Sequence, residues 1–92
     1  MNCIIIGAGN AGRPVARLLN YLGHNVTITD PKKLEDFHED FQKYLKIMEK
    51  EGVTLDLGNL TPNISKYTHA YTNDYRDGDS DIIFYNIFCD VF

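Results

Sequence analysis

The chain has no long apolar run. None of its hydrophobic stretches approaches the roughly 20 residues that a membrane-spanning helix needs, so we expect no membrane as a partner. No basic leader precedes the first apolar residues, Cys3 and Ile4. We therefore expect no signal peptide and a cytoplasmic location.

Basic residues are also scarce. Nine Lys and Arg stand against 13 Asp and Glu, which gives a net charge of −4. A nucleic acid needs a basic surface to neutralise its phosphates, so this balance argues against a nucleic acid as the main partner.

Reactive side chains are few and scattered. The two cysteines, Cys3 and Cys89, and the three histidines, His24, His38 and His69, show no spacing typical of metal ligands, so we predict no metal site. No Ser/His/Asp, Cys/His or paired-carboxylate arrangement has a supporting context. We therefore predict no catalytic residue in this chain.

What the chain does have is a glycine-rich turn after an apolar run. Residues 3–13 read CIIIGAGNAGR, which is a strand-like segment followed by Gly-x-Gly-x-x-Gly and a helical pattern. Gly7 lets the chain turn off the strand, Gly9 lets a pyrophosphate approach the backbone, and Gly12 lets the helix lie close to the strand. The N–H groups at the helix start form an anion site. This order predicts a Rossmann nucleotide site.

An acidic residue ends the next apolar run. Residues 26–30, VTITD, predict a second strand closed by Asp30, whose carboxylate can accept hydrogen bonds from both hydroxyls of a ribose. Arg13 lies close enough to the glycine turn to touch a ligand. The alternative is that the glycines serve only a tight turn and Asp30 only ends a strand; nucleotide binding, present or ancestral, is the better interpretation. The predicted nucleotide-binding residues are Gly7, Ala8, Gly9, Asn10, Ala11, Gly12, Arg13, Asp30, Pro31 and Lys32.

Hydrophobic periodicity predicts the remaining elements. Strands are expected over residues 2–6, 26–30, 53–57 and 82–87, and helices over about 10–22 and 33–51. In the first helix, an apolar face is expected to pack on the sheet; it consists of Val15, Leu18, Leu19 and Leu22. Strands that alternate with helices predict the α/β class, and the right-handed crossover of a βαβ unit places its two strands parallel. We therefore predict a Rossmann-like three-layer α/β/α sandwich with a parallel sheet in the order 3-2-1-4.

The end of the chain is harder to assign. Tyr67, Tyr71 and Tyr75 recur every fourth residue, which fits a helical stripe or a surface segment with aromatic anchors. A complete two-half dinucleotide fold needs roughly 150 residues, and this chain of 92 stops soon after the strand 82–87, which would lie at an open sheet edge. We expect a single domain that is the N-terminal fragment of a longer protein, or a homodimer formed through that edge.

Several short stretches together suggest a family. They are GAGNAGRP at residues 7–14, LLNYLGH at 18–24, TD at 29–30, EGV at 51–53 and DIIFYNI at 81–87. In this order they resemble the N-terminal domain of the Mur ligases, and most of all the D-glutamate-adding type and its relatives. The resemblance spans essentially the whole chain, although the glycine turn is shared with many dehydrogenases.

The resemblance implies a UDP-linked substrate and a role in cell-wall peptide synthesis. It assigns the Gly7–Gly12 turn to the diphosphate, and Asp30 with its neighbours to the uridine end. The chain departs from the family at residues 84–86, where FYN replaces the usual Ser-Pro-Gly or Ser-Pro-Asn turn. The family's Gly-Lys-Ser/Thr loop, its ATP and Mg²⁺ site and its C-terminal domain are absent. We therefore expect no ligase activity from this chain alone.

Two other functions remain open. One is an NAD-binding half-domain of a dehydrogenase, or of a regulatory module such as those on potassium transporters. There Asp30 would repel the 2′-phosphate of NADP, although Lys32 and Lys33 would soften the repulsion, so NAD is favoured. The other is a degenerate Rossmann domain kept for assembly.

Overall fold

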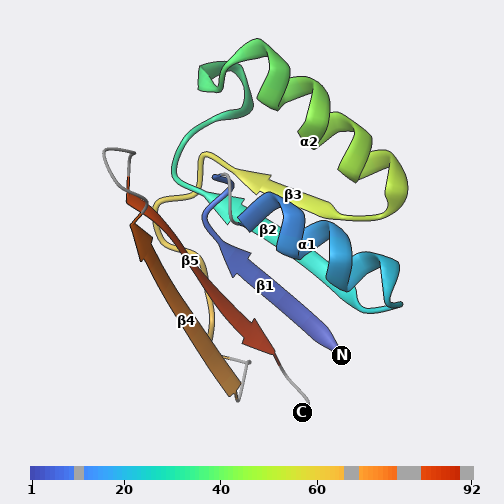
Figure 1. Ribbon diagram of the computed structural model, residues 1–92, viewed down its shortest axis with the longest axis vertical. Helices are drawn as coiled ribbons and strands as arrows, with labels where there is room; N and C mark the ends of the chain where they lie inside the picture. The colour runs from blue at the N-terminus through green and yellow to red at the C-terminus, as the bar shows by residue number, and fades with distance from the viewer. Residues whose placement is uncertain (10–11, 66–68, 77–81, 90–92) are drawn as a thin grey trace.

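The computed structural model of the chain describes residues 1–9, 12–65, 69–76 and 82–89, the last two ranges as backbone. Within them, the strands form one mixed sheet on which helices pack (Figure 1). The elements are β1 (Asn2–Ile6), α1 (Gly12–Tyr21), β2 (Asn25–Asp30), the 3-10 turn η1 (Leu34–Asp36), α2 (Glu39–Glu51), β3 (Thr54–Leu57), β4 (His69–Arg76) and β5 (Ile82–Cys89). The strand order in the sheet is β3-β2-β1-β5-β4.

The first half of the chain is a Rossmann-like β1–α1–β2–α2–β3 unit, as predicted. β1 pairs in parallel with β2, and β2 with β3. Because both crossovers are right-handed, α1 and α2 lie on the same face of the sheet. The three carboxyl ends therefore meet at one edge, which is where ligands bind in open α/β sheets.

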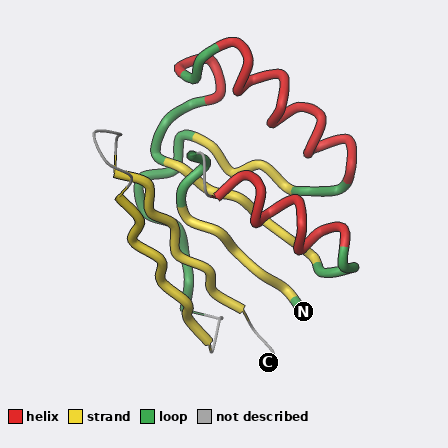
Figure 2. The backbone as a smooth tube through the Cα atoms, viewed as in Figure 1, coloured by secondary structure: helices red, strands yellow, loops and turns green. Residues whose placement is uncertain are grey.

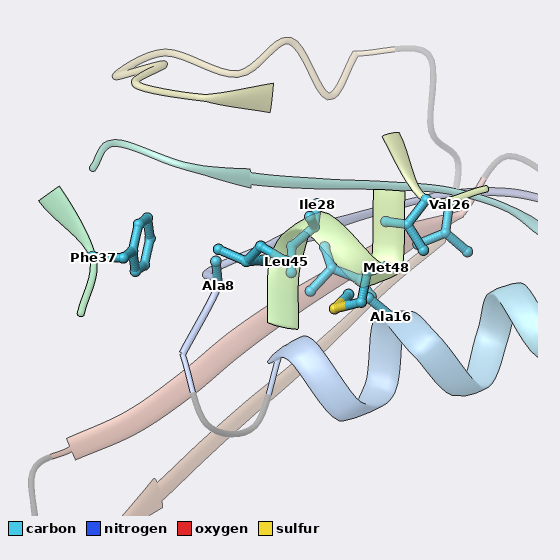
Figure 3. Close-up of a cluster of buried hydrophobic side chains, with 9 residues drawn as sticks. Ala8, Ala16, Val26, Ile28, Phe37, Leu45 and Met48 are labelled. Carbon is cyan, nitrogen blue, oxygen red and sulfur yellow. The ribbon is translucent and has the colours of Figure 1, made fainter. Parts of the chain in front are cut away.

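The core lies between this face and the two helices. Ile5 and Ile28 of the sheet contact Ala16 of α1 and Leu45 and Met48 of α2, and all five side chains are fully buried. Figure 3 shows Ala16, Ile28, Leu45 and Met48 pointing toward one another in this layer. Their burial, at about 25 cal/mol per Å² of apolar surface, is the main force that holds the helices on the sheet.

The prediction of an all-parallel sheet in the order 3-2-1-4 is not what the structure has. The last strand, β5, does lie beside β1, but it runs antiparallel to it and pairs with β4 on its other side. Only residues 77–81 separate β4 from β5. So short a connection closes an antiparallel hairpin, whereas a parallel pair needs a crossover of roughly a dozen residues or more. The strand 82–87 is therefore internal, and β4 is the edge strand on this side of the sheet.

The tyrosine pattern belongs to this hairpin. Tyr71 and Tyr75 lie in β4, so the helical stripe is wrong for them, while Tyr67 lies outside the described residues. A spacing of four is a multiple of two, so it suits a strand as well as a helix.

The predicted three-layer sandwich is only partly present. Figure 2 shows both helices over the parallel part of the sheet and the hairpin beside it. Among the described residues, no helix covers the opposite face, so the third layer is not shown. In the part of the chain that the structure describes, neither helix has the length and apolar character required to traverse a lipid bilayer.

The second predicted helix is divided in two. After η1, the backbone at Phe37 is extended (ψ 156°), and α2 begins only at Glu39. The His38 Nδ1 accepts a hydrogen bond from the Asp40 N–H, which makes His38 the N-cap. Phe37 is buried in the core. A capping side chain and a buried ring thus make the α-helix begin later than hydrophobic periodicity alone predicts.

The predicted apolar face of the first helix is only partly confirmed, because Val15 and Leu19 pack against the core but Leu18 and Leu22 do not. Leu18 and Leu22 are 58% and 62% exposed, while Gly12 and Ala16 are buried against the sheet. A Cβ at Gly12 would overlap the Gly7 carbonyl oxygen. The helix turns its smallest residues toward the sheet because only they allow its backbone to approach so closely.

Candidate functional site

The glycine turn lies at the carboxyl end of β1. Gly7 has a left-handed backbone (φ 111°), and its N–H donates to the Thr29 carbonyl of β2 at 2.8 Å. The Arg13 N–H donates to the Gly9 carbonyl at 3.2 Å, which is the first bond of α1. A Cβ at Gly9 would meet no described atom within 4 Å. Among the described atoms, the space beside Gly9 is therefore open.

Asp30 lies directly against this turn. Its Oδ2 accepts a hydrogen bond from the Ala8 N–H at 2.9 Å, and its Oδ1 accepts one from the Lys32 N–H at 2.8 Å. An ionised carboxylate has about four acceptor positions. Asp30 can therefore hold the turn and still accept hydrogen bonds from ligand hydroxyls.

The segment after β2 is held by the end of β3. The Gly58 N–H donates to the Asp30 and Lys32 carbonyls at 2.8 and 3.0 Å, and the Asn59 N–H donates to the Asp30 carbonyl at 3.2 Å. Pro31 and Lys32 are exposed, and the Lys32 ammonium lies 5.1 Å from the centre of the Phe37 ring. These contacts fix the loop on which the predicted ribose-binding residues lie.

Gly58 and Asn59 were not among the predicted site residues. Gly58 has φ 79°, and a Cβ there would approach the Lys33 Cγ to 3.0 Å. The signal that could have found them is positional. They follow β3 at the sheet edge where the carboxyl ends of the parallel strands meet.

Arg13 is placed differently from the other predicted residues. Its guanidinium carbon lies 3.8 Å from the centre of the Phe41 ring and 5.6 Å from that of Tyr44, both on α2. Its Nη1 donates to the Ala8 carbonyl at 3.3 Å, and the residue is only 7% exposed. Burial lowers the pKa of the guanidinium, while Tyr44 raises it. Arginine remains charged at neutral pH despite such a shift.

Arg17, one turn further along α1, is a useful contrast. Its Nε lies 3.0 Å from the Glu51 carboxylate at the surface, and its guanidinium carbon lies 5.6 Å from the centre of the Tyr44 ring. Hydrogen bonding to Tyr44 and the charge of Glu51 raise its pKa. Arg17 therefore lies on the same helix and near the same ring as Arg13, but its partner is on α2 and not in the glycine turn.

A polar network occupies the opposite face of the sheet at the same edge. Thr29 alternates with Ile28, so it points away from the helices, and it is fully buried. Its hydroxyl donates to Asp56 Oδ2 at 3.3 Å, and the Asn59 side-chain amide donates to the same oxygen at 2.8 Å. These bonds tie the ends of β2 and β3 together.

Two hollows lie among the described residues outside the glycine turn. One, of about 220 Å³, lies at the amino ends of the parallel strands and is lined by residues such as Asn2, Asn25 and Thr54. A second, of about 420 Å³, lies beside β3 and is lined by residues such as Leu34, Leu57 and Gly58, so it adjoins the loop that follows β2. Neither includes the glycine turn. We favour the turn as the site because its backbone geometry, and not its volume, is what a phosphate requires.

The structure thus brings together Gly7, Ala8, Gly9, Gly12 and Asp30 at one edge. Arg13 lies behind the turn against α2, and Pro31 and Lys32 lie on the adjoining loop. Asn10 and Ala11 lie outside the described residues.

Comparison with known proteins finds relatives that are much longer than this chain. It is 47% identical over 58 residues, which are 63% of this chain and 19% of the relative, to an uncharacterized protein of Methanothermobacter thermautotrophicus. It is 33% identical over 82 residues, which are 87% of this chain and 18% of the relative, to a UDP-glucose 6-dehydrogenase of Rickettsia typhi. The chain therefore spans about a fifth of the length of the curated relatives it matches. No protein-family model and no solved structure matches.

These relatives bear on the expectations from sequence. The likeness to a dehydrogenase, together with the parallel βαβ unit, supports a Rossmann-like nucleotide-binding domain. The narrower resemblance to Mur ligases receives no support from either relative.

Proposed function

We propose that this chain is a nucleotide-binding domain that takes a ribose joined to a diphosphate. The diphosphate lies on the turn Gly7–Gly12 at the start of α1, and Asp30 accepts hydrogen bonds from the ribose hydroxyls. The observation that carries the proposal is the bond between Asp30 Oδ2 and the Ala8 N–H at 2.9 Å. This bond holds the carboxylate at the end of β2 against the first part of the glycine turn, and it supports a site in which one nucleotide contacts both.

Two ligands share this chemistry. NAD is favoured by the acidic residue at the end of β2, and the dehydrogenase name of the Rickettsia relative supports a nicotinamide cofactor. A UDP-linked sugar is favoured by the Mur-ligase resemblance, and the same relative is named for UDP-glucose. The backbone N–H groups of the turn bind either diphosphate equally well. Discrimination therefore falls to Asp30 and the loop that follows it.

Calorimetric titration of the chain with NAD, NADP, UDP and UDP-glucose tests the proposal. We expect binding of at least one of them and a loss of about tenfold or more in affinity in Asp30→Asn, because a charged acceptor of the ribose is removed. Asp36→Asn is the matched control, since it removes the same charge from an exposed acid in η1.

The four titrations also separate the candidates. Preference for NAD that is lost in Asp30→Asn supports a dehydrogenase-type half-domain. Preference for UDP-glucose supports a UDP-linked sugar as the ligand. If none of the four binds, the proposal fails and a role in assembly takes its place.

A further inference from the structure

The peptide groups on either side of Ala8 are both held by charged side chains. On one side, the Ala8 N–H donates to the Asp30 carboxylate at 2.9 Å. On the other, the Ala8 carbonyl accepts from the Arg13 Nη1 at 3.3 Å. The Ala8 side chain is fully buried in the core, and Figure 3 shows it on the side of the layer toward Phe37. The first part of the glycine turn is therefore fixed at three points.

The Arg13 bond determines how the next N–H group points. A trans peptide is planar, and its C=O and N–H groups point in opposite directions. Since the Ala8 carbonyl points toward the Arg13 guanidinium, the N–H of Gly9 in the same peptide points away from it. Because Asp30 already takes the Ala8 N–H, Gly9 supplies the next N–H that the turn can offer to an anion.

The guanidinium itself is fixed by α2. It lies 3.8 Å from the centre of the Phe41 ring, at a residue that is only 7% exposed. A planar guanidinium stacks on an aromatic face in a way that a lysine ammonium cannot reproduce. Arg13 thus connects the position of α2 to the orientation of the Gly9 N–H.

We propose that Arg13 is a positioning residue, which holds the Ala8–Gly9 peptide in the orientation that a diphosphate needs, and not a phosphate ligand. This inference rests on the proposed function. Its structural part, the orientation of the Gly9 N–H by Arg13, can be tested without any nucleotide.

The first test uses the free protein. Arg13→Met removes the bond to the Ala8 carbonyl but keeps an apolar chain over Phe41, and we expect the amide resonance of Gly9 to shift in a ¹H–¹⁵N spectrum. Phe41→Leu removes the ring that holds the guanidinium and should shift the same resonance. Arg17→Met is the matched control, because that arginine is on the same helix and near Tyr44 but bonds to Glu51; it should leave Gly9 unchanged. An unmoved Gly9 resonance in Arg13→Met would overturn the inference.

The second test uses whichever nucleotide the unmodified chain binds, titrated at low and high salt. A positioning role predicts that Arg13→Met weakens binding about tenfold while the salt dependence stays the same, because no charge that contacts phosphate is lost. A direct phosphate ligand predicts a flatter salt dependence, since screening acts on the lost contact. The flatter result would overturn the inference.

Two further outcomes are separable. If Arg13→Met does not fold, Arg13→Lys replaces it in both tests. Lysine keeps the charge but not the planar face, so a positioning role predicts that Gly9 shifts and binding stays weak, and recovery of normal binding would contradict it. If the unmodified chain binds none of the nucleotides, the proposed function fails, whereas the Gly9 resonance still decides whether Arg13 orients the turn.

Discussion

Gly9 and Gly12 lie three residues apart, yet a side chain would meet different surroundings at each. A Cβ at Gly9 meets no described atom within 4 Å, whereas one at Gly12 overlaps the Gly7 carbonyl oxygen. Gly9 is also absent from the glycines with positive φ, so its backbone suits other residues. A substitution at Gly9 therefore tests ligand binding, whereas a substitution at Gly12 tests the packing of the fold.

We predict that Gly9→Val abolishes nucleotide binding and changes the free energy of unfolding by less than about 1 kcal/mol. The branched side chain enters the space that the diphosphate would occupy. Gly12→Ala, by contrast, should destabilise the chain by about 1–3 kcal/mol or more, as at other overpacked sites, because the new Cβ overlaps the Gly7 carbonyl oxygen. Urea unfolding followed by calorimetric titration checks both variants. Normal binding by a folded Gly9→Val variant would show that the turn is structural only.

At the scale of the element, α1 is apolar on two sides. Leu19 packs against the core, while its neighbour Leu18 is 58% exposed. Sequence periodicity treats these two leucines as equivalent, because both fall on the same broad apolar arc. The small residues Gly12 and Ala16 decide which side faces the sheet, since they let the helix backbone approach most closely.

Because Leu19 packs against the core and Leu18 is exposed, the two leucines provide a matched pair of substitutions. We predict that Leu19→Ala lowers the free energy of unfolding by about 1–2 kcal/mol and that Leu18→Ala changes it by no more than about 0.5 kcal/mol. Both replace leucine by alanine in one helix, so helix propensity affects them alike. Urea midpoints measure the difference. Equal losses would mean that a partner covers Leu18 in solution, and the midpoint would then depend on protein concentration.

Some features of the elements could be predicted from the sequence, and others depend on how the elements pack together. The positions of Gly7, Gly12 and Asp30 at one sheet edge could be predicted, because a glycine spacing after one apolar run and an acidic residue at the end of the next both reflect local backbone geometry. The direction of β5 could not be predicted, because an apolar strand has the same pattern whichever way it runs. Arg13 was placed beside the turn, but its contact with Phe41 depends on how two helices pack.

At the scale of the whole molecule, the sheet has two distinct ends. The glycine turn and Asp30 lie where β1 and β2 end, and the small polar hollow near Asn2 and Asn25 lies where they begin. Both ends offer polar groups to a ligand. The parallel direction of β1, β2 and β3 argues for the carboxyl end, because in open α/β sheets ligands bind outside the carboxyl ends of the strands.

Hydrogen exchange can locate the ligand along this axis. We predict that a bound nucleotide slows exchange of the Ala8 and Lys32 amides, both bonded to Asp30, since the ligand holds that carboxylate and the turn in place. The Asn25 amide, which donates to the Met1 carbonyl at the other end of the sheet, should exchange at its unliganded rate and serves as the internal control. Protection of Asn25 without protection of Ala8 would instead place the ligand in the amino-end hollow. A nucleotide there would lie away from the α1 N-terminus, and its affinity would not respond to Gly9→Val.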